Sequence, residues 1–237
     1  MKKFKIKIRN FWKSHFLKNI STDDRQALMS FVQNIYWGED LSLAQAKKNL
    51  EEGIVEIVYD NGQHRGNGLL ITDNGFIITC NHCIFPSFDK LKVVKNSGEH
   101  YPIDYICHSK QDRDIVLFKA DIPGLAKPRE YKFFDSREFR VYRKYLVVGL
   151  VRWDGKLMIK GGYTCGSLVA SLTVDNTDLY KDMMILKTKL IKGDSGGIIA
   201  TINSEVVGIH SSGIDGCSYC TPWNVILEIV SIFSQLT

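Results

Sequence analysis

The sequence lacks any long apolar segment. Its apolar runs stay well short of the roughly 18 residues that a membrane-spanning helix requires. The first 20 residues contain no acidic residue, and Lys13 and Lys18 interrupt the continuous apolar core that a secretory signal would need. We therefore expect an intracellular protein, located in the cytoplasm, without a membrane span.

Internal repeats, low-complexity tracts and an appended peptide-binding domain are also missing from the sequence. The 237 residues are 44% hydrophobic and 24% charged, which is ordinary for a soluble globular protein. A chain of this length suits one or two domains with a substantial core. Composition thus excludes a fibrous, disordered or membrane-spanning protein and leaves the function to be argued from motifs.

Basic residues gather at the N-terminus. Seven of them fall in residues 1–20, whereas the net charge of the whole chain is only +5. Lysines alternate with apolar residues over 3–9, and Phe11, Trp12 and Phe16 follow. This pattern suits an anionic membrane or nucleic acid. It suits equally a solvated edge strand whose lysines prevent aggregation, which is the commoner case, so we expect neither a nucleic-acid nor a membrane partner.

The cysteines admit three interpretations. In an intracellular protein the six thiols stay reduced, whereas an even count in an exported protein permits a disulfide framework. Two pairs have the spacing of zinc ligands, although cysteine is also a common small core residue. We favour reduced thiols and no metal. The six residues are Cys80, Cys83, Cys107, Cys165, Cys217 and Cys220.

The most informative motif is Gly-Asp-Ser-Gly-Gly, over residues 193–197. Its glycines form a tight turn in which the backbone N–H groups of Gly193 and Ser195 point into one small space. Such a pair can hold a developing oxyanion. The Ser195 hydroxyl is a weak nucleophile at neutral pH, so this interpretation requires a base and an orienting acid elsewhere in the chain.

Both partners are found upstream. His82 ends the apolar, strand-like run 77–83 and is the candidate general base. Asp114 directly precedes the apolar run 115–118 and is the candidate acid that holds the histidine tautomer. Asp112, two residues earlier, is the alternative, and we interpret it as a solvated loop acid.

The chain order His82, Asp114, Ser195 is that of chymotrypsin-type proteases. With these motifs, the sequence from about Gly53 to the C-terminus resembles a trypsin/chymotrypsin-fold serine protease, nearer to the HtrA-type and glutamyl-endopeptidase-type members than to the digestive enzymes. The resemblance implies an all-β fold of two six-stranded antiparallel barrels of the chymotrypsin type. It also implies a reaction without a cofactor. An N-terminal helical extension and a C-terminal helix complete the expected fold.

We divide the chain into a basic arm and helical extension (1–52), an N-terminal barrel (53–122), an inter-barrel linker (123–135) and a C-terminal barrel with its closing helix (136–237). Hydrophobic periodicity and caps predict helices from Ser21 to Gly38, over 43–52 with Gly53 closing it, and over 223–233. A strand is predicted over 3–9. The barrel strands are predicted over 54–60, 68–72, 76–79, 91–94, 103–107, 115–119, 145–151, 157–160, 165–172, 183–188, 197–201 and 206–210.

Asp194 has two interpretations under the resemblance. In members activated by cleavage, a new N-terminal amine pairs with the acid that precedes the serine. HtrA-type members do without that event, and we expect the same here, because Gly53-Ile54-Val55 lies too close before His82 to serve as an activation site.

The wall of the primary specificity pocket is expected from residues His210, Ser211, Ser212 and Gly213. The Gly-x-His-x-x-Gly pattern of 208–213 resembles glutamyl endopeptidases, exfoliative toxins and picornaviral proteases, in which the histidine binds a Glu or Gln side chain. Leu190 departs from that pattern, because the relatives carry a threonine there. A buried structural histidine bonded to backbone is the alternative for His210.

We therefore predict a serine endopeptidase that forms an acyl-enzyme on Ser195 and cleaves after Glu or Gln in a protein or peptide substrate. Two alternatives stay open. One is a catalytically idle binding module with a protease fold. The other is an effector protease with a different preference, activated when a regulatory protein engages residues 1–52.

Overall fold

The computed structural model describes residues 21–33, 48, 50–134, 146–174, 178–188, 190–201, 203–214 and 217–235. The basic arm and the strand predicted over 3–9 lie outside these residues, as does most of the helix predicted over 43–52. Among the described residues, no helix is long and apolar enough to cross a membrane.

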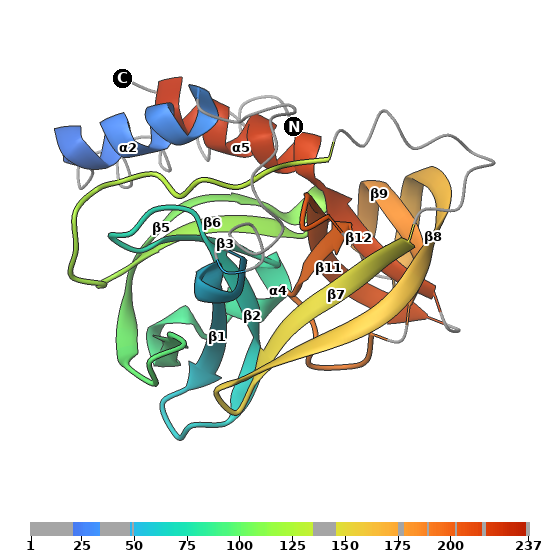
Figure 1. Ribbon diagram of the computed structural model, residues 1–237, viewed down its shortest axis with the longest axis horizontal. Helices are drawn as coiled ribbons and strands as arrows, with labels where there is room; N and C mark the ends of the chain where they lie inside the picture. Colours follow the sequence, from blue (N-terminus) through green and yellow to red (C-terminus); the bar gives the residue numbers. More distant parts are fainter. Residues whose placement is uncertain are drawn as a thin grey trace, which may run out of the picture.

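Two closed antiparallel barrels, each with six strands, form the body of the molecule (Figure 1). The first is ordered β1-β2-β3-β6-β5-β4 and the second β10-β11-β12-β9-β8-β7. This confirms the predicted fold class. The strands are β1 (Ile54–Tyr59), β2 (His64–Leu70), β3 (Phe76–Thr79), β4 (Leu91–Val94), β5 (His100–Lys110), β6 (Ile115–Ala120), β7 (Leu146–Trp153), β8 (Lys156–Val174), β9 (Asp178–Thr188), β10 (Ile198–Thr201), β11 (Val206–Ile214) and β12 (Cys217–Pro222).

Three strands that the sequence predicted well are short and predominantly apolar. β3, β4 and β6 begin as predicted, and every residue of β3 and β6 is buried. Continuous apolar content suits these strands because the closed barrel covers one face and neighbouring elements cover the other. The hairpin turns at Gly62 and Gly75 have φ of +82° and +104°, values that glycine adopts without strain.

Several strands differ from the prediction, including β2, β5 and β9, which begin earlier in the chain than predicted. β8 is a single strand of 19 residues where two were expected, because Gly161 and Gly162 pair with Val148 and Val147 of β7 instead of forming a turn. β12 was not predicted, since its sequence is largely polar and its place is fixed by pairing with β9 and β11. β11 continues beyond His210 to Ile214.

Two longer helices lie side by side across one end of the molecule (Figure 1). These are α2 (Thr22–Gln33), which Ser21 caps by accepting a hydrogen bond from Asp24 N–H at 3.1 Å, and α5 (Trp223–Gln235). Leu28 of α2 is fully buried in the core, and Asp24 pairs with Lys119 of β6 at 3.0 Å. The apolar face of α2 therefore packs within the molecule.

Arg152 of β7 joins the two barrels. Its side chain is 1% exposed. The guanidinium donates hydrogen bonds to the carbonyls of Ile54, Glu51 and Gly155 and to Asn96 Oδ1, at 2.7–3.0 Å. A buried cation is stable only when its donors are satisfied, so the second barrel is fixed to β1 and to the helical residues just before it.

Candidate active site

The residues expected at the site come from three separate connections. His82 lies in the short helix α4 (Asn81–Ile84) that follows β3, and Asp114 lies between the turn η3 (Gln111–Arg113) and β6. Ser195 lies in the turn that precedes β10. A further turn, η2 (Phe88–Lys90), follows α4.

His82 and Asp114 contact each other directly. His82 Nδ1 lies 2.8 Å from Asp114 Oδ2, and the His82 backbone N–H donates to Asp114 Oδ1 at 3.1 Å. Asp114 is 1% exposed, and its left-handed φ of +45° ends the η3 turn. Asp112 is exposed within η3. The geometry therefore places Asp114, and not Asp112, against the imidazole.

Ser195 lines the same cleft as His82, but its hydroxyl bonds elsewhere. Ser195 Oγ donates to the carbonyl of Ser211 at 3.0 Å. His82 Nε2 lies 3.9 Å from Cys83 Sγ. The Ser211 hydroxyl donates to Asp114 Oδ2, so Ser211 contacts both the acid and the serine.

The turn over 193–197 depends on glycine. Gly193 and Gly196 have φ of +96° and +78°, and a Cβ at Gly196 would lie 1.8 Å from the Asn67 carbonyl. Asp194 N–H donates to Ile191 O at 3.0 Å, and Gly196 N–H donates to His210 O at 2.8 Å. Within this turn, the N–H groups of Gly193 and Ser195 have no protein acceptor among the described residues, as an anion-binding turn requires.

Asp194 is completely buried and carries its own cation partner. Lys160 of β8 donates to Asp194 Oδ2 at 2.5 Å, and Ile191 N–H donates to the same oxygen at 2.7 Å. Sequence reasoning considered only a chain-terminal amine for this role and did not identify Lys160. The lysine compensates the buried charge from within the second barrel.

The residues expected to form a specificity pocket do not act as one group. His210 is 2% exposed, and its Nδ1 has no hydrogen-bond partner among the described residues. Burial lowers the pKa of His210 to about 4, so its imidazole is neutral at pH 7. Ser212 Oγ is also buried and unpartnered there, whereas Ser211 is bonded to Asp114 and Gly213 is exposed.

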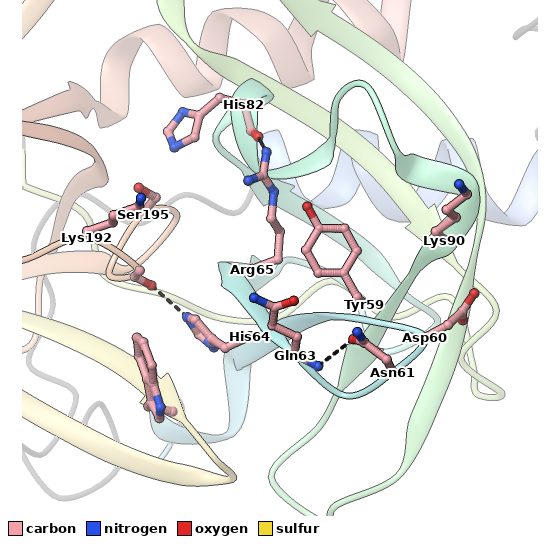
Figure 2. Close-up of a pocket in the computed structure, with 12 residues that line it drawn as sticks. Tyr59, Asp60, Asn61, Gln63, His64, Arg65, His82, Lys90, Lys192 and Ser195 are labelled. Carbon is pink, nitrogen blue, oxygen red and sulfur yellow. Dashed lines mark hydrogen bonds between the residues drawn. The ribbon is translucent and has the colours of Figure 1, made fainter.

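A cleft of about 810 Å³ opens beside Ser195 and His82 (Figure 2). Two lysines and one arginine line this cleft. The one acidic residue in its lining, Asp60, pairs with Lys92 at 3.2 Å. The sequence did not predict this cleft lining, because the hairpin over 59–65 contains no recognisable catalytic or binding motif. The lining residues are Tyr59, Asp60, Asn61, Gln63, His64, Arg65, His82, Lys90, Trp153, Lys192, Gly193 and Ser195.

The candidate metal ligands among the described residues differ from the zinc-like cysteine pairs of the sequence. Cys217 and Cys220 are three residues apart in β12, and odd spacing on a strand points side chains to opposite faces. Three possible ligand atoms lie within 4.8 Å of one another, one each from Cys80, His82 and Asp114. Cys80 Sγ, however, donates to His210 O at 2.9 Å, and Asp114 already binds His82. Five cysteines are free thiols, and the side chain of Cys165 lies outside the described residues.

The Cys83 thiol affects the charge of His82. A hydrogen bond between the Cys80 and Cys83 side chains is the main cause that lowers the pKa of Cys83, to about 6; burial opposes this effect, and a hydrogen bond to His82 adds to it. Burial lowers the pKa of His82, but hydrogen bonds to Asp114 and Cys83 outweigh burial and raise that pKa well above its ordinary value.

We predict that Cys83→Ala moves the titration of His82 to lower pH, by about one pH unit or more, because an adjacent anionic partner is removed. An NMR titration of the His82 imidazole measures this shift. Cys107→Ala, at a buried thiol in the same barrel, is the control and leaves the titration unchanged. An unchanged His82 midpoint in Cys83→Ala would show that Asp114 alone sets the pKa.

Replacing Lys160 by Met leaves the Asp194 carboxylate buried without its cation. We expect the free energy of unfolding to fall by about 3 kcal/mol or more, because an unpaired buried charge is costly. Chemical denaturation measures it, with Lys156→Met, at an exposed lysine of the same strand, as the control. The double variant Lys160→Met with Asp194→Asn recovers part of the loss; equal stability of Lys160→Met and the control would contradict this pairing.

Comparison with known proteins assigns the chain to a family. Residues 66–209, more than half of the chain, match the family model described as a trypsin-like peptidase domain. A probable periplasmic serine protease (do/HhoA-like) of Haemophilus influenzae is 26% identical over 172 residues, covering 70% of this chain and 35% of the relative. A probable periplasmic serine endoprotease (DegP-like) of Rhizobium meliloti is 26% identical over 173 residues, covering 70% and 32%.

A probable serine protease (do-like) of Buchnera aphidicola is 22% identical over 179 residues, covering 72% of this chain and 35% of the relative. The chain thus spans about a third of the length of these curated relatives. The two-barrel fold, the match over residues 66–209 and these relatives agree with the resemblance to HtrA-type proteases, and the chain belongs to the trypsin-like peptidase domain family.

Proposed function

We propose that this chain is a serine endopeptidase in which Ser195 is the nucleophile, His82 the general base and Asp114 the orienting acid. The observation that carries the proposal is the 2.8 Å contact between His82 Nδ1 and the buried Asp114 carboxylate, beside a cleft that Ser195 also lines. Membership of the trypsin-like peptidase family supports it.

In the reaction, Ser195 Oγ attacks the peptide carbonyl carbon while its proton passes to Nε2 of the neutral form of His82, which the raised pKa of this histidine makes the minor form at pH 7. The carbonyl oxygen becomes an oxyanion, and the N–H groups of Gly193 and Ser195 stabilise it. His82 then protonates the leaving amine, the C–N bond breaks, and an acyl-enzyme remains on Ser195. Water, deprotonated by His82, attacks the acyl carbon, and His82 returns the proton to Ser195 Oγ as the acid product leaves.

The hydroxyl must turn for this reaction to begin. Ser195 Oγ now donates to the Ser211 carbonyl at 3.0 Å, and rotation about its Cα–Cβ bond redirects it toward His82 Nε2. Hydrogen bonds between catalytic groups commonly tighten only when substrate binds. The same orientation is compatible with the second candidate function, an effector protease that a regulatory protein activates through residues 1–52.

We propose cleavage after Glu or Gln. His210 is neutral at pH 7 and has an unpartnered Nδ1, so it keeps hydrogen-bonding capacity for a substrate carboxylate or amide. Ser212 Oγ is similarly unpartnered among the described residues. We do not include Ser211 in the wall of the specificity pocket, because its hydroxyl donates a hydrogen bond to Asp114. Leu190, where the relatives with this preference usually have threonine, is buried in the core of the second barrel.

The substrate is proposed to be a protein or peptide, and no cofactor takes part in the proposed reaction. The cytoplasmic location stays a prediction. It was drawn from the N-terminal basic arm, which lies outside the described residues, whereas two of the relatives named above are periplasmic.

Single substitutions of the proposed triad test the proposal. We expect Ser195→Ala and His82→Ala to lower kcat/KM by about 10⁴-fold or more, and their effects not to add, because the residues act as a unit. Asp114→Asn lowers it by about 10⁴-fold, while Asp112→Asn, the control, has little effect. Labelling by a fluorophosphonate probe, lost in Ser195→Ala, reports the nucleophile independently. A chain that the probe never labels is either the idle binding module or an effector protease that lacks its activating partner.

Specificity is tested with a peptide library and with matched substrates that differ only in the residue before the scissile bond. His210→Ala is expected to reduce kcat/KM at least about tenfold for the Glu substrate, because a polar contact is lost. The Ala substrate is the internal control and changes little. Cleavage dominated by Arg, Lys or aliphatic residues would overturn the proposed preference while leaving the triad intact.

A further inference from the structure

A second histidine, His64 of β2, touches the anion-binding turn from the other barrel. Its Nε2 lies 2.7 Å from the Gly193 carbonyl oxygen, and its Nδ1 lies 2.6 Å from Glu56 Oε1. Both side chains are largely buried, at 9% exposed for His64 and 5% for Glu56. In Figure 2 the imidazole points from the β2 hairpin toward the Gly193 carbonyl.

The number of protons on His64 follows from these two contacts. A backbone carbonyl only accepts hydrogen bonds, and a carboxylate also only accepts, whereas a neutral imidazole carries a single N–H. Glu56 accepts further hydrogen bonds from Asp154 N–H at 3.2 Å and Gly155 N–H at 3.1 Å, which favours its ionised form. Both short contacts are hydrogen bonds only when His64 is an imidazolium.

The surrounding charges agree with this protonation state. Burial lowers the pKa of His64, but hydrogen bonds to Glu56 and the Gly193 carbonyl outweigh burial and raise it above the ordinary value. Burial raises the pKa of Glu56, while hydrogen bonds from His64, Gly155 and Asp154 lower it overall. Negative charge on Cys83 of α4 also raises the pKa of His64, as the smallest of these effects. The other ionisable groups that line the adjoining cleft are Asp60, Arg65, His82, Lys90 and Lys192.

The contact acts on the backbone of the turn. The Gly193 carbonyl belongs to the peptide between Gly193 and Asp194, which lies between the peptides that carry the N–H groups of Gly193 and Ser195. Asn67 Nδ2 reaches the same carbonyl at 3.3 Å. Trp153 stacks on His64 with ring centroids 4.1 Å apart, and a Cβ at Gly193 would lie 2.4 Å from this indole. The carbonyl is thus held by two side chains, and the indole of Trp153 leaves no room for a side chain at the α-carbon.

We propose that His64, held as an imidazolium by Glu56, is a positioning residue that fixes the Gly193–Asp194 peptide and so aims the N–H groups of Gly193 and Ser195 at the oxyanion. This proposal rests on the proposed function. The alignment of these two N–H groups then depends on pH. It is present below the pKa of His64 in the folded protein, and it weakens as pH rises through that pKa. A residue of the first barrel thereby positions the oxyanion-binding turn of the second barrel.

Two measurements test the proposal on the full chain. The first is an NMR titration of His64, assigned by comparison with His64→Gln. We expect a midpoint above the ordinary histidine value, and a midpoint at lower pH in Glu56→Gln, because the carboxylate that stabilises the imidazolium is gone. This measurement needs no enzymatic activity.

The second measurement is the pH profile of kcat and KM on a peptide substrate, together with the affinity for a peptidyl aldehyde that forms a tetrahedral adduct. His64→Ala is expected to lower kcat and aldehyde affinity about tenfold, with KM changed less than about twofold, because the aligned N–H groups act in the transition state. His64→Gln, which keeps one donor, recovers part of kcat. Glu56→Gln moves the alkaline loss of kcat to lower pH.

His100→Gln, at an exposed histidine of β5, is the matched control and leaves all of these quantities unchanged. A His64 midpoint at the ordinary value in both the wild type and Glu56→Gln would overturn the proposal, as would His64→Ala with an unchanged kcat and alkaline limb. If the fluorophosphonate probe fails to label Ser195, the proposed function fails separately, and the NMR titration alone then decides whether Glu56 holds an imidazolium.

Discussion

The hydrogen bonds of one buried amide, Asn67, connect the two barrels at the site. Asn67 N–H donates to the Ser195 carbonyl at 2.8 Å, and its side chain reaches the Gly193 carbonyl at 3.3 Å and accepts from Arg152 N–H at 2.6 Å. Thr79 donates to the Asn67 carbonyl. Because β2 and the turn at Ser195 belong to different barrels, the position of the Ser195 turn relative to His82 depends on this junction.

The buried carboxylates near this junction each have a charged or ionisable partner. Three acids with side chains at most 5% exposed each contact a cationic or ionisable partner: Asp114 with His82, Asp194 with Lys160, and Glu56 with His64. A buried carboxylate without such a partner would be costly. Each pair therefore contacts a different part of the site: the His82 base, Asp194 within the turn, and the Gly193 carbonyl that His64 reaches.

The fold and the candidate triad were predictable because both depend on local signals. Glycine at residues 193 and 196 is required by positive φ, and apolar runs such as 76–79 and 115–119 form strands as predicted. Lys160 and His64 could not be found in this way, because their partners lie 34 and 129 residues away in the chain. Those contacts depend on strand register and on how the barrels meet, which local sequence patterns do not determine.

Arg152 has a consequence for how the protein unfolds. Its guanidinium is buried between the barrels and bonded to backbone carbonyls that include those of Ile54 and Glu51. If either barrel opened alone, this cation would lose its acceptors while still partly enclosed, at a cost of several kcal/mol. Partial opening is therefore unfavourable relative to complete unfolding, and the two barrels behave as one cooperative unit although each is closed by its own hydrogen bonds.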